Sequence, residues 1–520
     1  MLMLPASVLA RDDFAQKLTA LNAGSFSGKE SAIRELAATG HERAPAILKA
    51  LLEGRLYCRE DGTIVIVAEH EDGYQLTDAI SGAGLGVVET SAVKRISLNN
   101  SLRSLLRESM ARFDLESPDA AIRLAAVIEL TGHLGPEAAA LLRQRLPDEQ
   151  DAGVRDAMEI AVALSDLTSV DSARVMQALA VLQGSLGTEI RGAIANVSEN
   201  HPDAAVRKKA AQTLASIEGR IRFYGFVETL FFGLSMGSIL VLIAIGLAIT
   251  FGVMGVINMA HGELMMLGAY TTYAVQQIFP NHIELSLLIA VPAAFLVSGA
   301  AGVAIERGVI RFLYGRPLET LLATFGISLI LQQLVRTLIS AQNVAVVTPQ
   351  WMSGSWQIND VLSLTCNRLY VFIFAMLVFA ALVALLKRSR LGLEVRAVAQ
   401  NRAMARAVGI RTGWVDALTF SLGSGIAGVA GVALSQLTNV GPNLGQGYII
   451  DSFMVVVFGG VGNLWGTLVG GISLGVANKF LEPMAGAVVA KILVLVFIIL
   501  FIQKRPRGLF PQKGRAVEAH

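Results

Sequence analysis

The sequence predicts a mostly α-helical protein in two parts: a soluble domain of helical hairpins with a small β insert, then a polytopic helical membrane domain of about eight spans with broken helices. Three observations predict this. The 520 residues are 53% hydrophobic and 16% charged, with a mean hydropathy of +0.56, which is too apolar for a soluble chain of this length. Apolar stretches of roughly 20 residues, the length of a membrane-spanning helix, follow one another only after Phe223. Residues 11–222 are rich in Arg, Glu, Asp and Ala and contain internal near copies.

The first ten residues, MLMLPASVLA, are apolar and end in small residues before the charged RDDF. This pattern resembles the end of a secretory signal peptide that is cleaved after Ser-Val-Leu-Ala, if translation begins further upstream. A short buried strand or an accidental apolar start is the alternative. We therefore expect a signal-peptide remnant over 1–10, a soluble extracytoplasmic domain over 11–222 and a transmembrane domain over 223–515.

Repeats organise the soluble domain. SPDAAIRLAA (117–126) and HPDAAVRKKAA (201–211) are near copies, and DAGVRDAMEIAVAL (151–164) is a weaker third. In the first copy, Ser117 is predicted to cap a helix, with Pro118 at the first helical position and Asp119 near the positive end of the helix dipole. Such units predict stacked helical hairpins of the HEAT type.

The remaining soluble segments carry no catalytic constellation. A helical stretch is expected over 29–54, and alternating DGTIVIVAEHEDGYQL predicts a β insert over roughly 56–97. The scattered histidines are expected at the surface: His41, His70, His133 and His201. We expect this domain to contact a partner protein or to give structural support.

Eight apolar segments are candidate spans. They are 226–250, 262–279, 285–305, 319–340, 369–387, 413–436, a broken segment 449–481, and 486–503.

Charge asymmetry predicts the orientation. Basic residues gather in the connection 387–412, in the link after the third span (Arg307, Arg311, Arg316) and in the C-terminal tail (Lys504, Arg505, Arg507, Lys513, Arg515), whereas the alternate connections hold almost none. The positive-inside rule places the basic connections in the cytoplasm, so the soluble domain lies outside, in the periplasm, and the protein is expected in a bacterial inner membrane surrounded by lipid. Arg220 and Arg222, just before the first span, oppose this assignment.

Several functions are excluded by the sequence. There is no G-x-x-x-x-G-K-[ST] loop for ATP, and the His-Gly-Glu at 261–263 lacks the P-C-x-x-C of a zinc deaminase. Two cysteines, Cys58 and Cys366, are too few for a metal cluster, and we expect no disulfide between them although both would lie on the oxidising side. With a net charge of +2, no nucleic-acid partner is expected. We expect no enzyme activity, no metal and no cofactor.

Two membrane segments are interrupted by glycine and asparagine: FGVMGVINMAHGE (251–263) and VFGGVGNLWG (457–466). Such interruptions in the two halves of a transporter indicate an internal repeat and helices that break inside the bilayer. Asn258 and Asn463 either satisfy backbone groups freed by the breaks or line the pathway of a small polar solute. His261 and Glu263 are either packing or gating contacts at the cytoplasmic interface or solute ligands.

The basic connection SRLGLEVRAVAQNRAMARAVGIRT (389–412) predicts a short cytoplasmic helix that ends at Gly409. Either it docks on another protein or it is an ordinary positive-inside loop.

Long stretches resemble one transporter family: GLSMGSILVLIAIGLAITFGVMGVINMAHGELMMLGAY, RPLETLLATFGISLILQQ and VVVFGGVGNLWGTLVGG. They are similar to the permease subunits of branched-chain amino-acid-type ABC importers, over residues 225–510. The soluble extension and AQNVAVVTPQWMSGSWQI (341–358) resemble the urea-transport branch. The resemblance implies a second permease subunit in a heterodimer, two cytoplasmic ATP-binding subunits and a periplasmic solute-binding protein. It also implies that 389–412 holds the ATPase-coupling helix, with Glu394, Arg396, Arg402, Arg406 and Gly409 as its candidate residues.

The resemblance leaves the solute open between urea and a branched-chain amino acid. A neutral solute needs hydrogen-bonding groups and no buried charge, whereas a zwitterion prefers helix N-termini and a charge partner. The candidates for a substrate path are polar: Asn258, His261, Glu263, Gln332, Gln333 and Asn463. This favours urea, and a passive channel or a membrane sensor is the more distant alternative.

Overall fold

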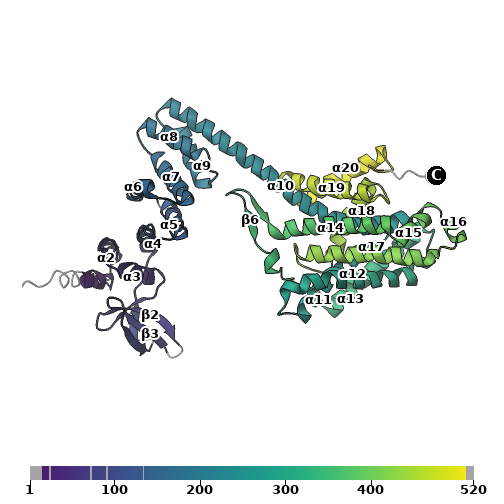
Figure 1. Ribbon diagram of the computed structural model, residues 1–520, viewed down its shortest axis with the longest axis horizontal. Helices are drawn as coiled ribbons and strands as arrows, with labels where there is room; N and C mark the ends of the chain where they lie inside the picture. Colours follow the sequence, from purple (N-terminus) through teal and green to yellow (C-terminus); the bar gives the residue numbers. More distant parts are fainter. Residues whose placement is uncertain (1–13, 23–24, 71–72, 90–91, 133, 511–520) are drawn as a thin grey trace, which may run out of the picture. The chain divides into compact units, whose positions relative to one another are not determined.

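The computed structural model describes residues 14–22, 25–70, 73–89, 92–132 and 134–510 (Figure 1). The chain divides into two compact units, one up to Gly219 and one from Arg220. The predicted signal-peptide remnant lies outside the described residues, as do His133 and the tail after Phe510. The predicted fold class is confirmed, because helices dominate both units and the small sheet belongs to the first.

The first unit is a stack of short helices. They are α2 (Phe26–Ala38), α3 (Ala44–Leu52), α4 (Asn100–Asp114), α5 (Ala120–Gly132), α6 (Pro136–Arg145), α7 (Ala152–Asp166), α8 (Ser172–Leu182) and α9 (Thr188–Asn200), with 3-10 turns at Ala20–Asn22 and Leu146–Asp148. Helix α4 packs on α5, α5 and α6 on α7, and α7 on α8. The predicted helix over 29–54 is two helices, because Gly40 between them adopts a positive φ of 63°.

The β insert is a five-stranded antiparallel sheet with the order β4-β3-β2-β1-β5. Its strands are β1 (Leu56–Arg59), β2 (Ile64–His70), β3 (Gly73–Asp78), β4 (Gly84–Val88) and β5 (Val93–Arg95). Val65, Val67, Leu76 and Val93 form a small core on the sheet. The insert therefore appears where the alternating pattern predicted it.

The first repeat begins differently from the prediction. Helix α5 begins at Ala120, and Asp119 caps it by accepting the N–H of Ala121 (2.9 Å). Ser117 accepts the N–H of Asp119 instead (3.2 Å), so Ser117 was wrongly predicted as the cap and Pro118 lies before the helix. The aspartate is the better cap because it stands next to the orphan N–H groups of the first turn.

An arginine four residues after the capping aspartate completes each repeat. Arg123 donates to the carbonyls of Ser117 and Pro118 (2.9 and 3.1 Å). In the second copy Arg207 donates to the carbonyls of His201 and Pro202 (2.7 and 2.9 Å). In the weaker copy Arg155 donates to the carbonyl of Glu149. This shared contact accounts physically for the repeated Asp-x-x-x-Arg spacing.

One ion pair joins neighbouring repeats. The Arg123 guanidinium contacts both carboxylate oxygens of Glu149 (2.8 and 2.7 Å), and this bonding holds the pKa of Glu149 at about 2. The bidentate geometry fixes the start of α5 against the segment that leads into α7.

The second unit is a bundle of long helices. Helix α10 (Ala204–Met254) begins in the first unit; the others are α11 (His261–Ile278), α12 (Ile283–Gly308), α13 (Pro317–Leu338), α14 (Cys366–Arg388), α15 (Arg390–Gln400), α16 (Arg402–Ala407), α17 (Thr412–Ser435), α18 (Leu444–Gly459), α19 (Leu464–Ala485) and α20 (Ala487–Lys504). A hairpin of β6 (Ser355–Gln357) and β7 (Ser363–Thr365) precedes α14. Within the described residues, six helices are long and apolar enough to cross a membrane: α10, α12, α13, α14, α17 and α20.

Helix α17 is the centre of the bundle, where α11 and α12 pack on it (Figure 1). A Cβ at Gly428 would overlap Ser298 of α12, and one at Gly268 of α11 would overlap the backbone of Gly428. Small residues let membrane helices approach this closely. Outward faces of α13, α14 and α20 are apolar and exposed, as suits lipid or another subunit.

The broken segment predicted at 449–481 is a helical hairpin. Gly470 of α19 lies against Val455 of α18, and Gly466 against Gly459, so the two helices run antiparallel. The hairpin brings the chain back to the side from which α18 started. The turn of this hairpin, around 460–463, lies beside the C-terminal tail.

Candidate functional site

The first break separates α10 from α11. Helix α10 ends at Met254, Gly255 turns the chain with a φ of 64°, and α11 begins at His261. Asn258, His261 and Glu263 are all buried in the bundle. A helix does break at the predicted place, and its polar residues are buried in protein.

A polar stripe on α13 faces this break. Thr320, Thr324, Ser328 and Gln332 recur every fourth residue and are buried, although most of α13 is exposed. The Thr324 hydroxyl accepts the N–H of Met259 (3.1 Å) and lies 3.3 Å from the carbonyl of Ile257. Thr324 thus satisfies backbone groups that the interrupted helix leaves free.

The buried carboxyl group of Glu263 lies at the centre of this site. Its Oε1 accepts hydrogen bonds from Ser328 Oγ (3.0 Å) and Gln332 Nε2 (2.7 Å). His261 Nε2 lies 2.9 Å from the carbonyl of Ile243, and Asn258 Oδ1 accepts the N–H of Ala260 (3.0 Å). Among the described residues, Glu263 Oε2, His261 Nδ1 and Asn258 Nδ2 have no partner. These atoms retain hydrogen-bonding capacity for a water or a polar solute.

The structure brings Asn258, His261, Glu263 and Gln332 to the same break, but places the other two path candidates elsewhere. Gln333 is exposed on α13, away from the stripe, where it contacts Thr337 (3.4 Å). Asn463 caps α19 by accepting the N–H groups of Trp465 and Gly466 (3.0 and 3.1 Å).

The C-terminal tail closes the second break. Leu509 and Phe510 donate their N–H groups to the carbonyls of Phe458 and Gly459 (2.9 and 3.1 Å), and Asn463 Nδ2 donates to the Phe510 carbonyl (3.2 Å). The last turn of α10, just before the first break, also touches the second break, since a Cβ at Gly252 would overlap the backbone of Gly462. We call the second break, the C-terminal tail up to Phe510, the end of α10 and the nearby end of α14 the basic end of the bundle.

The basic connection is two helices, α15 and α16, where the sequence predicted one. Ser389 caps α15, and Asn401 caps α16 by accepting the N–H of Met404 (2.9 Å), which starts a new helix. Gly409 follows with a φ of 91°, as expected of the residue that ends this segment. Its exposed residues include apolar ones, Met404 and Val408, which suit a protein partner.

The predicted coupling residues have partners inside this chain. Arg402 forms an ion pair with the fully buried Asp416 of α17 and lies over the ring of Tyr314 (4.6 Å). Tyr314 in turn donates to Glu306 of α12 (3.1 Å).

The remaining coupling candidates are less constrained. Arg396 donates to the carbonyl of Leu386, Arg406 lies 3.5 Å from the Thr412 hydroxyl, and Glu394 is half-buried. The connection is therefore anchored to the bundle through Arg402 and through buried apolar residues, Val395, Val398 and Ala405, that pack with Val415 of α17.

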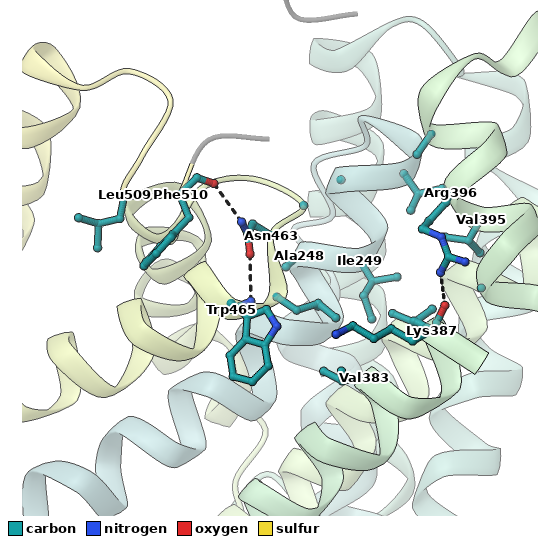
Figure 2. A pocket seen from close by; sticks show the side chains of 17 residues that line it. Ala248, Ile249, Val383, Lys387, Val395, Arg396, Asn463, Trp465, Leu509 and Phe510 are labelled. Atoms are coloured by element: carbon teal, nitrogen blue, oxygen red, sulfur yellow. Dashed lines mark hydrogen bonds between the residues drawn. The ribbon is translucent and has the colours of Figure 1, made fainter. Parts of the chain in front are cut away.

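A cavity opens at the basic end (Figure 2). Its volume is about 690 Å³, and α10, α14, α15, the start of α19 and the C-terminal tail form its walls. Lys387, Arg396, Asn463 and Trp465 lie around it. The cavity therefore lies between the coupling segment and the second break.

Sequence reasoning missed an ion pair inside the membrane unit. Lys491 of α20 contacts Asp451 of α18 (3.0 Å), with the Asp451 side chain 11% exposed and that of Lys491 44% exposed. Single charges within apolar helices were the available signal. Thr324 and Ser328 were also missed, and their four-residue spacing before Gln332 was the signal.

Broken helices, buried polar groups beside them and a basic connection between spans define a polytopic membrane transport subunit. The chain belongs to the family described as branched-chain amino acid transport system / permease component, whose model matches residues 229–502. The predicted resemblance is thereby confirmed at the level of the family.

Individual relatives support the same family assignment. The chain is 32% identical over 295 residues to the high-affinity branched-chain amino acid transport system permease protein BraD of Pseudomonas aeruginosa, covering 55% of this chain and 96% of the relative. It is 31% identical to LivH of Escherichia coli, with the same coverage, and 28% identical to the ribose import permease protein RbsC of Escherichia coli, covering 53% of this chain and 84% of the relative. No solved structure matches. These relatives are transport permeases and not enzymes.

The Glu263 site gives a first prediction. Gln332→Leu removes a donor to a buried carboxylate and should destabilise the protein by about 1–3 kcal/mol. The adjacent Gln333→Leu changes an exposed residue and should not. The amount of monodisperse purified protein and its thermal midpoint measure both. Equal behaviour of the two variants would show that the Gln332 contact is dispensable.

The ion pair of Arg402 with Asp416 gives a second prediction. Arg402→Ala leaves Asp416 buried without its cation and should cost about 1–3 kcal/mol, because the guanidinium is partly exposed and screened. Arg406→Ala is the matched control, and Arg402→Ala with Asp416→Asn should recover much of the loss. Thermal unfolding of the purified protein compares the four proteins. A double variant no better than Arg402→Ala would argue against the pair.

Proposed function

We propose that this chain is the permease subunit of an ATP-driven importer and forms half of the translocation path. Family membership and the broken-helix bundle support this. The partners would be a second permease subunit, two cytoplasmic ATP-binding subunits and a solute-binding protein. The α15–α16 connection would carry the contact with an ATP-binding subunit, because it is basic, exposes apolar residues and is anchored to the bundle through Arg402.

For the solute, we propose a zwitterionic amino acid with an apolar side chain. The observation that carries this is the Asp451–Lys491 pair, since the argument for urea rested on the absence of such charges. An intramembrane ion pair offers an anion to an ammonium group and a cation to a carboxylate. The names of the relatives point the same way and do not support urea.

Urea stays a second candidate because of one observation. The family model begins at residue 229, and relatives matched over 96% of their length account for only 55% of this chain. The first unit is thus additional to those amino acid permeases, and the sequence resembles the urea branch in having it.

Uptake distinguishes the two solutes. In proteoliposomes with the complete importer, labelled leucine should accumulate on ATP addition and labelled urea should not. Asp451→Asn with Lys491→Met should lower leucine uptake about tenfold or more, as expected when about 1.4 kcal/mol or more of binding is lost. Neutralising the Lys479–Glu482 pair of α19, which is similarly close (2.6 Å), is the control. Uptake of urea alone would overturn the amino acid proposal.

The orientation is also a proposal: the first unit outside the cytoplasm and the basic end inside. A protein without Cys58 and Cys366 can carry one new cysteine at Val170, whose side chain is 96% exposed, or at Val408, which is 70% exposed. In cells with a permeabilised outer membrane, an impermeant thiol reagent should label Val170→Cys and spare Val408→Cys. The reverse labelling would invert the topology.

A further inference from the structure

The cavity at the basic end has an apolar wall. Ile249 of α10, Val383 of α14, Val395 of α15 and Trp465 of α19 contribute to it. A volume of about 690 Å³ is within the range of small-molecule sites, and an apolar wall of this kind suits a hydrocarbon chain better than a soluble ion.

The charge around the cavity has a single sign. Lys387 and Arg396 are the charged residues among the described residues that line it, and no described lining residue is acidic. One N–H of Arg396 is used by the Leu386 carbonyl, which fixes the side chain and leaves further donors. Within the described part of the chain, Lys387 has neither a hydrogen-bond nor an ion-pair partner, and its ammonium extends toward the Asn463 and Trp465 side of the cavity (Figure 2). The site therefore selects an anion.

The cavity lies where a membrane helix meets water. Lys387 is the penultimate residue of α14, a helix apolar enough to span the bilayer, and more basic residues follow directly. Trp465 is 54% exposed beside it. Tryptophan and basic residues in this position mark the level of the lipid headgroups.

We propose that this cavity binds an acidic phospholipid of the phosphatidylglycerol type. Lys387 and Arg396 bind the phosphate, and an acyl chain lies along Ile249, Val383 and Trp465. Arg396 belongs to α15 and Lys387 to α14, so the bound phosphate joins the coupling segment to a spanning helix. Basic cavities between membrane helices on the cytoplasmic side commonly bind acidic headgroups.

Native mass spectrometry of the purified full-length protein tests this, with phosphatidylglycerol and phosphatidylethanolamine of identical acyl chains as probes. Lys387→Gln with Arg396→Gln should weaken phosphatidylglycerol binding about 30-fold, since each cation near a membrane surface contributes about fivefold. Arg388→Gln with Arg390→Gln removes two charges beside the cavity but outside its lining and should change the affinity less than about threefold. Equal losses in the two double variants would show a diffuse charge effect and overturn the site.

A second measurement locates the acyl chain and does not depend on the charge variants. Phosphatidylglycerol brominated on its acyl chains should quench fluorescence in the wild-type protein, and Trp465→Phe should remove most of that quenching, whereas Trp351→Phe should not. Inorganic phosphate at the same concentration should not displace the lipid. Displacement by phosphate would reduce the site to anion binding, and displacement by added ATP-binding subunits would assign the cavity to protein docking; either result would overturn the proposal.

Discussion

The membrane unit depends on how it satisfies backbone groups where two helices are interrupted. An interrupted helix leaves backbone N–H and carbonyl groups without partners inside the helix, and here other parts of the protein supply those partners. At the first break Thr324 of α13 pairs with the backbone around Met259, and at the second the tail residues Leu509 and Phe510 pair with the end of α18. Both sets of partners come from segments distant in sequence. A movement of α13 or of the tail would therefore change the hydrogen bonding of these breaks.

The two breaks lie close to α15 and α16, the helices of the basic connection. Gly252, in the last turn of α10 before the first break, lies against Gly462 of the second break, and the cavity beside them has Arg396 of α15 in its lining. On its other side the connection is held by the Arg402–Asp416 pair, which joins α16 to the central helix α17. A force on α15–α16 would thus reach both the packed centre of the bundle and the breaks. This arrangement is consistent with the docking role proposed for α15–α16.

The sequence predicted those features that depend on local patterns. Glycine and asparagine in apolar runs predicted both breaks, and PDAA copies predicted the repeats. It failed where tertiary contacts decide: Gln332 and Gln333 looked equivalent, but only Gln332 falls on the stripe that faces Glu263. The Ser117 cap failed for a smaller reason, because two capping residue types stand close together and the local backbone selects Asp119. The split between α15 and α16 was readable at Asn401, a good cap within a helical pattern.

Two sites with titratable side chains, Glu263 and the Asp451–Lys491 pair, differ in what they indicate about the solute. Glu263 is held by neutral donors, Ser328 and Gln332, and shares its surroundings with unpaired polar atoms, so it offers hydrogen bonds to any polar molecule that reaches it. The Asp451–Lys491 pair is different because its two charges match those of an amino acid, and because Lys491 remains partly exposed on an otherwise apolar helix. Such a side chain is costly against lipid and is stable beside water or protein. The exposed flank of α20 around Lys491 therefore suits contact with water or protein better than contact with lipid.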